Sequence, residues 1–186
     1  MKNSPLAGAL AIAALLQAGC AMKNAVTTVP PGTQQVAEGH SILVIGVGLE
    51  AQWDAPMFSV QLDEYDVAKQ ASAGNCWRYN RALAIVPSEP GVVRHVAFDV
   101  PAGQYAFSGF GAGRGLEGGP QAFAAPSGQV VHVGDFIYAP SGYLVLRRNL
   151  EAARASLAST SPELAKRISP ASATTIKAPV GILCTP

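Results

Sequence analysis

The stretch "VVRHVAFDVPAGQYAF", residues 92–107, carries the clearest structural signal in the chain. Apolar side chains alternate with polar or small ones on both sides of a Pro-Ala-Gly turn: Val96, Phe98, Val100, Tyr105 and Phe107. A period of two residues is that of a β-strand with one buried face. We therefore predict two strands that are joined by the turn at 101–103 into a β-hairpin.

Similar β-rich runs lie on both sides of this stretch. They are "HSILVIGVGLE" at 40–50, "MFSVQLDEY" at 57–65, "YNRALAIVP" at 79–87 and three or four short strands within 121–149. Gly, Pro and Asp separate the runs at near-regular spacing, which is typical of strands that follow one another without intervening helices. The predicted fold is mainly β, an antiparallel β-sandwich.

A helical period appears only near the C-terminal end. In the segment 149–160, Asn149 can cap a helix that has one apolar stripe. In the segment 161–169, Ser161 can cap a second helix with Pro162 at its first position. We expect two short C-terminal helices, a helical appendage over about 149–169.

Length and charge limit the function classes. The chain has 186 residues, enough for one domain with a hydrophobic core. Its formal net charge is +1, with 13 basic and 12 acidic residues. This balance provides no excess of positive charge for binding phosphates, so we do not expect nucleic acid as a partner.

The first twenty residues have the proportions of a secretory signal. "MKNSPLAGALAIAALLQAGC" contains one lysine, an apolar run over 6–16 and then small residues. The apolar run is too short to span a bilayer as a helix. We therefore expect export from the cytoplasm.

The end of this segment resembles a bacterial lipoprotein signal, in which two small residues precede a cysteine that receives diacylglycerol. Ala18 and Gly19 occupy the two small positions, whereas Gln17 stands where the family has Leu, Val or Ile. The resemblance implies lipidation at Cys20 and, because Ala21 follows, an outer-membrane location that faces the periplasm. The alternative is ordinary signal cleavage, which would leave a soluble periplasmic or secreted chain.

The predicted organisation has three parts. Residues 1–19 form the signal peptide, and residues 20–39 form a flexible tether, because that segment is polar, rich in Pro and Gly and without a sustained period. Residues 40–186 form the sandwich domain and its appendage.

Two cysteines besides Cys20 allow one intramolecular pairing. In an oxidising compartment we predict a disulfide between Cys76 and Cys184. The alternative is two separate buried thiols.

Two further stretches, "FDVPAGQYAF" at 98–107 and "GQVVHVGDFIYAP" at 128–140, resemble secreted bacterial β-sandwich domains of the transthyretin-like or prealbumin-like kind. Such domains recur in uncharacterised lipoproteins, and the resemblance covers residues 41–147. It implies a fold and a surface location. It carries over no catalytic residue.

Glycines in "VIGVGLEA", 44–51, match a dinucleotide-binding fingerprint. That site requires a helix immediately after the glycines, whereas here Pro56 and a β pattern follow. We therefore interpret Gly46 and Gly48 as residues that ease a bent strand. No cofactor is predicted.

The three histidines give no local metal or catalytic motif. His95 and Asp99 lie four residues apart, about 13 Å along a strand. His132 and Asp135 lie three residues apart, which predicts opposite faces of an unbroken strand. We therefore expect structural histidines and no metal site, and the chain also lacks a G-x-S-x-G hydrolase motif.

These observations favour a non-catalytic cell-envelope protein that presents a binding or scaffolding surface to an unknown envelope protein or glycan. One alternative is a periplasmic hydrolase in which His95, Asp99 and His132 converge only in the folded chain. Another is a carbohydrate- or peptidoglycan-binding module that uses aromatic side chains. The aromatic candidates are Trp53, Trp77, Tyr79, Tyr105, Phe107, Tyr138 and Tyr143.

Overall fold

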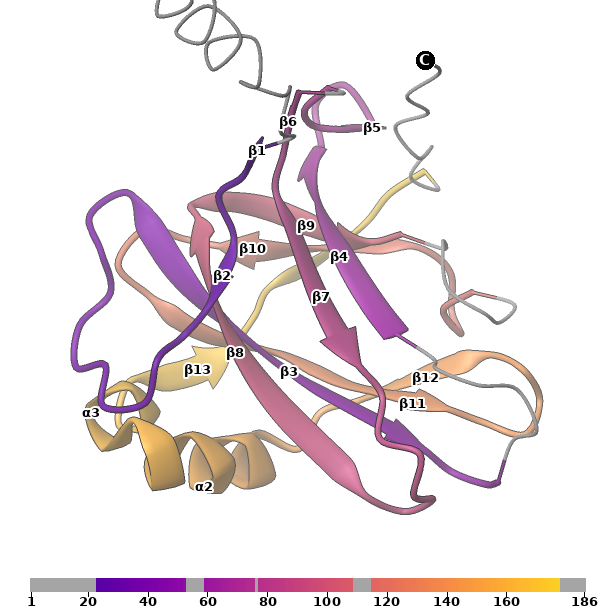
Figure 1. Cartoon of the computed structure of the whole chain (residues 1–186). Helices are drawn as coiled ribbons and strands as arrows, with labels where there is room; N and C mark the ends of the chain where they lie inside the picture. Colours follow the sequence, from indigo (N-terminus) through magenta and orange to yellow (C-terminus); the bar gives the residue numbers. More distant parts are fainter. Residues whose placement is uncertain (1–22, 53–58, 76, 109–114, 178–186) are drawn as a thin grey trace, which may run out of the picture.

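The computed structural model is built mainly from strands (Figure 1). It describes residues 23–52, 59–75, 77–108 and 115–177. Two sheets pack face to face, and two short helices lie near the C-terminal end, so the predicted mainly β sandwich with two short C-terminal helices is confirmed. None of the helices in the described ranges is both long and apolar enough to cross a membrane.

The first sheet, which we call the helix-covered sheet, holds the candidate site. Its strands are β2 (Thr27–Thr28), β3 (His40–Leu49), β8 (Val93–Pro101), β11 (Val130–Tyr138), β12 (Leu144–Arg147) and β13 (Ile168–Pro170). They follow the order β12-β11-β3-β8-β2, with β13 beside β11. The central pair β3 and β11 runs parallel, whereas β3 pairs antiparallel with β8.

The second sheet completes the sandwich. Its strands are β4 (Ser59–Asp66), β5 (Ala71–Ser72), β7 (Arg81–Ile85), β9 (Gly103–Phe107), β10 (Gln121–Ala125) and β14 (Ala173–Thr175). They follow the order β14-β10-β9-β4-β5, with β7 beside β4. A separate parallel pair joins β1 (Lys23–Asn24) to β6 (Arg78–Tyr79).

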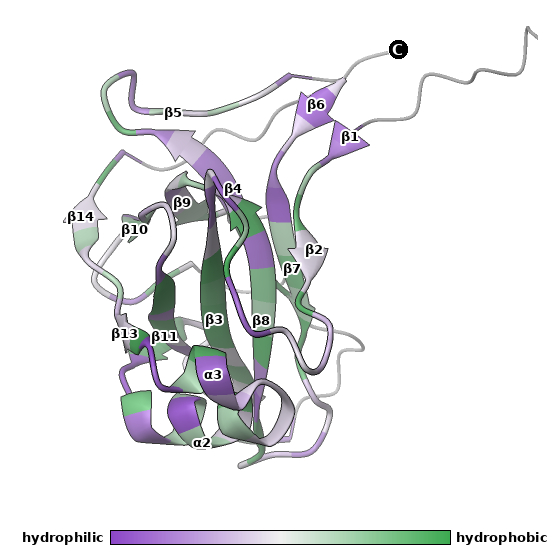
Figure 2. Cartoon of the chain, turned by 90° about the vertical axis from the view of Figure 1, so that its left-hand side faces the viewer, coloured by the Kyte–Doolittle hydropathy of each residue, from purple (hydrophilic) through white to green (hydrophobic). Residues whose placement is uncertain are grey.

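The main core lies between the two sheets. Alternate residues of β3 and β8, including Leu43, Ile45 and Phe98, face Leu62 and Phe123 of the second sheet. Burial of this apolar surface is the dominant favourable contribution to folding. Figure 2 shows the strands of this core as mostly hydrophobic, whereas β1 and β6, at the end far from the helices, are hydrophilic.

The outer face of the helix-covered sheet is covered by α2 (Leu150–Thr160) and α3 (Pro162–Ala165). The side chain of Asn149 caps α2 by accepting a hydrogen bond from the backbone N–H of Ala152 at 3.1 Å, as predicted. A second buried cluster forms where the helices meet the sheet: Ile42, Val44, Val130, Ala153, Leu157, Leu164, Ala165 and Ile168. The outer face of this sheet is therefore shielded from water as well.

The predicted hairpin at 92–107 is wrong. The two strands, β8 and β9, belong to different sheets: β8 pairs with β3 and β2, and β9 pairs with β4 and β10. The Tyr105 hydroxyl donates a hydrogen bond to the carbonyl of Pro101 at 3.0 Å and so fastens the corner between the sheets. The alternation of apolar residues shows which face is buried, and both strands do face the core, but it does not identify a strand's neighbour.

The predicted flexible tether is wrong for residues 23–39. Within this segment β1 pairs with β6 and β2 pairs with β8, and Val26 is buried. The N–H of Val29 donates to the carbonyl of Ala97 at 2.9 Å. Backbone groups make these bonds, so a polar, Pro-containing sequence can still follow the edge of a sheet.

Candidate metal centre

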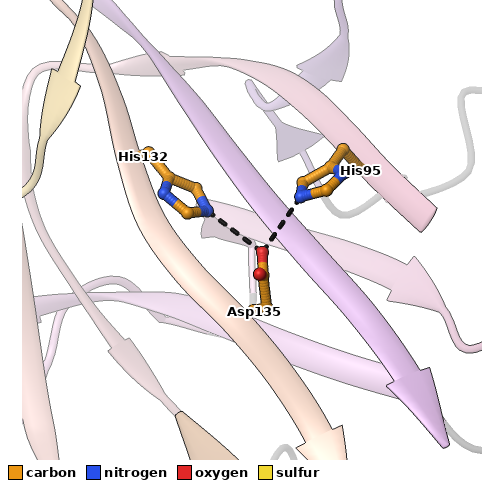
Figure 3. A group of neighbouring side chains, drawn as sticks. All are labelled: His95, His132 and Asp135. Carbon is orange, nitrogen blue, oxygen red and sulfur yellow. Dashed lines mark hydrogen bonds and ion pairs between the residues drawn. The ribbon is translucent and has the colours of Figure 1, made fainter. Parts of the chain in front are cut away.

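A cluster of two histidines and one aspartate lies on the outer face of the helix-covered sheet. His95 comes from β8, His132 and Asp135 come from β11, and β3 lies between these strands. Both imidazoles point at the same carboxylate oxygen (Figure 3). The distance to Asp135 Oδ1 is 3.0 Å from His95 Nε2 and 3.1 Å from His132 Nε2.

A β-bulge in β11 places His132 and Asp135 on the same face. The register with β3 shifts between His132 and Gly134, and Gly134 has a φ of 136°, in the region that glycine adopts readily. Val133 points into the main core. The prediction that His132 and Asp135 lie on opposite faces is therefore wrong, because one extra residue reverses the alternation after the bulge.

Gly46 of β3 provides the space for the carboxylate. Gly46 is opposite His95 in β8 and opposite Asp135 in β11, so the three residues form one row across the sheet. A Cβ atom at position 46 would lie 2.1 Å from Asp135 Oδ1. β3 runs through Gly46, as expected for a strand, and the absence of a side chain there leaves room for the Asp135 carboxylate.

The cluster is buried and charged. The side chains of His95, His132 and Asp135 are 7%, 2% and 6% exposed. Burial by itself would raise the pKa of Asp135, but hydrogen bonds from His132 and His95 and their charge outweigh burial and lower that pKa to about 2. Asp135 is therefore ionised at neutral pH, and each Nε2 must carry the proton that it donates to the carboxylate.

This carboxylate should make folding sensitive to acid. The pKa of Asp135 is about 2 in the folded chain and 3.8 without the fold, so protons bind more readily to the unfolded chain. The contribution of Asp135 to the unfolding free energy should be complete above about pH 4. It should be lost as pH falls towards 2. This difference in the pKa of Asp135 corresponds to about 2 kcal/mol of unfolding free energy. Urea unfolding in metal-free buffer from pH 5 to pH 2.5 measures it, and an Asp135→Asn variant with the same pH slope would contradict the prediction.

A cavity of about 90 Å³ lies beside His95, between the sheet and α2. Its lining combines apolar side chains with hydroxyl groups of the helix: Val44, His95, Ala97, Ser156, Leu157, Ser159 and Thr160. The Ser159 and Thr160 hydroxyls donate to helix carbonyls. In the described part of the chain no hydroxyl is hydrogen bonded to either imidazole of the cluster.

The remaining predicted polar residues lie elsewhere. Asp99 does not join His95; its carboxylate pairs with His40 Nδ1 at 2.6 Å, and both side chains are about one third exposed. Of the hydrolase candidates, the structure therefore brings together His95 and His132, with Asp135 in place of Asp99. Asp135 is absent from the predicted hydrolase residues because an unbroken alternation places it on the opposite face from His132, although a glycine inside a strand is itself a signal for a bulge.

The described aromatic residues do not assemble the predicted platform. Tyr105, Phe107 and Tyr138 are buried in the main core, whereas Trp77 and Tyr143 are exposed. Trp53 lies outside the described residues. The three core residues cannot contact a glycan, so the platform as predicted is wrong for them.

The three cysteines lie outside the described residues. Lipidation at Cys20 and a disulfide between Cys76 and Cys184 therefore stay predictions. Comparison with protein-family models, with curated proteins and with solved structures gives no match for this chain. The resemblances to lipoproteins and to transthyretin-like domains likewise stay predictions.

Proposed function

We propose that this chain is a cell-envelope protein that binds a divalent transition-metal ion through His95, His132 and Asp135, without catalysing a reaction. One observation carries the proposal. The ligand atoms of these three side chains lie within 4.8 Å of one another in a buried position. Two imidazoles and a carboxylate are a ligand set that suits Zn²⁺ and its neighbours in the first transition row.

The distances fit such an ion after small movements. Two ligand atoms that are each about 2.1 Å from a tetrahedral ion lie about 3.4 Å apart. The two Nε2 atoms are now 3.0 and 3.1 Å from Asp135 Oδ1, so each needs to move by a few tenths of an ångström from the carboxylate. The three ligand atoms lie within 4.8 Å of one another, so the two imidazoles must also move closer together to share the ion. All three residues lie in paired strands of one sheet, so these adjustments would fall mainly on their side chains.

The protonation states are also compatible with binding. A metal ion would replace the two Nε2–H groups that now donate hydrogen bonds to the buried carboxylate, and each ring, when neutral and metal-bound, would carry its proton on Nδ1. Neither Nδ1 atom is hydrogen bonded to a described residue, so both positions can accept the proton. The ionised Asp135 supplies the negative charge that a divalent cation requires.

Binding is favoured over hydrolysis by the surroundings of His95. A hydrolase with a serine or threonine nucleophile needs that hydroxyl within hydrogen-bond reach of its base. The Ser159 and Thr160 hydroxyls in the cavity donate instead to the carbonyls of Ser156 and Leu157. A cavity of about 90 Å³ is also well below the roughly 300 Å³ that is usual for a small-molecule substrate.

The location is part of the same proposal. The signal-like N-terminus supports export, and the cysteine at its end supports a lipid anchor at Cys20 that holds the chain at the outer membrane, facing the periplasm. The same compartment would allow a disulfide between Cys76 and Cys184.

Metal titration of the purified mature chain tests the metal site. After chelator treatment, calorimetry with Zn²⁺ should give one site per chain, and His95→Ala should abolish it. His40→Ala is the matched control, because His40 also bonds an aspartate but lies outside the cluster, and it should bind Zn²⁺ as the unmodified chain does. Equal Zn²⁺ affinity in the His95→Ala and His40→Ala variants would refute the site.

A further inference from the structure

The N-terminal segment fixes where any anchor at Cys20 would hold the domain. Residues 23 and 24 form β1, and their partners in β6 are Arg78 and Tyr79. The N–H of Lys23 donates to the carbonyl of Trp77 at 2.8 Å, and the side chain of Asn24 donates to the carbonyl of Arg81 at 2.9 Å. The chain therefore reaches the fold at Lys23 and not after a long free segment.

Only three residue steps separate Cys20 from Lys23. A chain spans at most about 3.6 Å per residue, so Cys20 lies within about 11 Å of Lys23 whatever path the chain follows. The headgroup region of one leaflet is about 5 to 8 Å thick. An acylated Cys20, with its acyl chains in the hydrocarbon, would thus bring the β1–β6 pair to the headgroups.

The surface at this point has the chemistry of a membrane interface. Trp77 is 60% exposed, more than any other large apolar side chain in the described ranges. The flanking Lys23 and Arg78 are exposed, and neither forms an ion pair with another described residue. Tryptophan is enriched at membrane–water interfaces, and basic side chains attract anionic headgroups.

We infer that Lys23, Trp77 and Arg78 form the surface through which this protein contacts the membrane, with Trp77 inserted among the lipid headgroups. This inference rests on the proposed lipid anchor. Figures 1 and 2 both place β1 and β6 at the end opposite α2 and α3, so the helices would point away from the bilayer. The domain would therefore be seated on the bilayer and oriented, in contrast to a domain on a flexible tether.

Tryptophan fluorescence of the full-length acylated protein tests the orientation. The chain has two tryptophans, so a Trp53→Phe variant leaves Trp77 as the only reporter. The protein is reconstituted into vesicles of phosphatidylethanolamine and phosphatidylglycerol, with and without acyl chains brominated near the headgroup. We expect a blue-shifted Trp77 emission that the brominated lipid quenches at least twofold. A Cys20→Ser chain mixed with the same vesicles should show neither effect.

The outcomes separate the anchor from the orientation. Intact mass establishes whether the mature chain carries acyl groups. An acylated chain in which iodide quenches Trp77 as strongly as in the Cys20→Ser chain would overturn the orientation and leave the anchor standing. A mature chain without acyl groups would overturn the anchor and this inference with it. The Trp77→Phe variant, in which only Trp53 emits, should lose the lipid-dependent signal; if it keeps that signal, residue 77 is not the contact.

Discussion

The Gly46→Ala variant is expected to lose at least about 3 kcal/mol of unfolding free energy and all Zn²⁺ binding. The added Cβ would lie 2.1 Å from Asp135 Oδ1 and 2.7 Å from Asp135 Cγ, so the carboxylate would have to move. Overfilling a packed site costs about 1 to 3 kcal/mol, and the displaced carboxylate would also lose hydrogen bonds from two imidazoles. Urea unfolding and zinc calorimetry measure the two effects.

Gly103→Ala is the matched control for this variant. Gly103 also lies in a strand, β9, but a Cβ there would meet its nearest atom, Glu64 Oε1, at 3.5 Å, an ordinary contact. Its backbone does not have a positive φ. We expect Gly103→Ala to change the unfolding free energy by less than about 1 kcal/mol, because alanine also reduces the entropy of the unfolded chain. Similar losses in both variants would show that Gly46 has no special role.

The strands could be predicted because burial of one face produces an alternation of apolar and polar residues in the local sequence. Phe98, Val100, Tyr105 and Phe107 alternate with smaller or polar residues, and all four are buried in the main core. No comparable local pattern shows which strands pair with one another. A chain that turns at Pro101 can continue beside its own strand or cross to the opposite sheet with the same side chains buried.

The complete candidate site could not be predicted because it joins residues that are distant in the sequence. His95 meets Asp135 across the intervening strand β3, forty residues apart in the sequence. The bulge at Gly134 then decides which face Asp135 occupies. Gly46 completes the site by leaving space, and a missing side chain does not reveal which distant group requires that space.

The N-terminal segment was predicted wrongly for a different reason: its composition is that of a linker, although its backbone pairs with the rest of the fold. Residues 24–39 are polar and contain two prolines, which is typical of a linker. In the fold, the N–H groups of Lys23, Val29 and Gly32 donate to carbonyls of Trp77, Ala97 and Thr160. A strand that adds to a sheet edge through its backbone needs few apolar side chains, so hydropathy does not detect it.

The second large effect is expected for the Asp135→Ala variant. It should lose about 3 to 5 kcal/mol of unfolding free energy in metal-free buffer at pH 7. The substitution would leave two imidazole N–H donors buried without an acceptor, and each unsatisfied donor costs about 1 to 3 kcal/mol. The space left by the carboxylate adds a smaller loss of packing. Urea unfolding measures the change.

Asp99→Ala is the matched control, because it also removes the carboxylate partner of a histidine. The His40–Asp99 contact, at 2.6 Å, is shorter than either contact of Asp135, but its side chains are 33% and 30% exposed. Water can replace the lost partner there, so we expect a cost below about 1 kcal/mol. The burial of the pair, and not the length of its hydrogen bond, should therefore determine which variant loses more unfolding free energy. If Asp135→Ala cost no more than Asp99→Ala, water would replace the lost carboxylate in the cluster too, which would contradict the buried, imidazole-bound carboxylate on which the metal site depends.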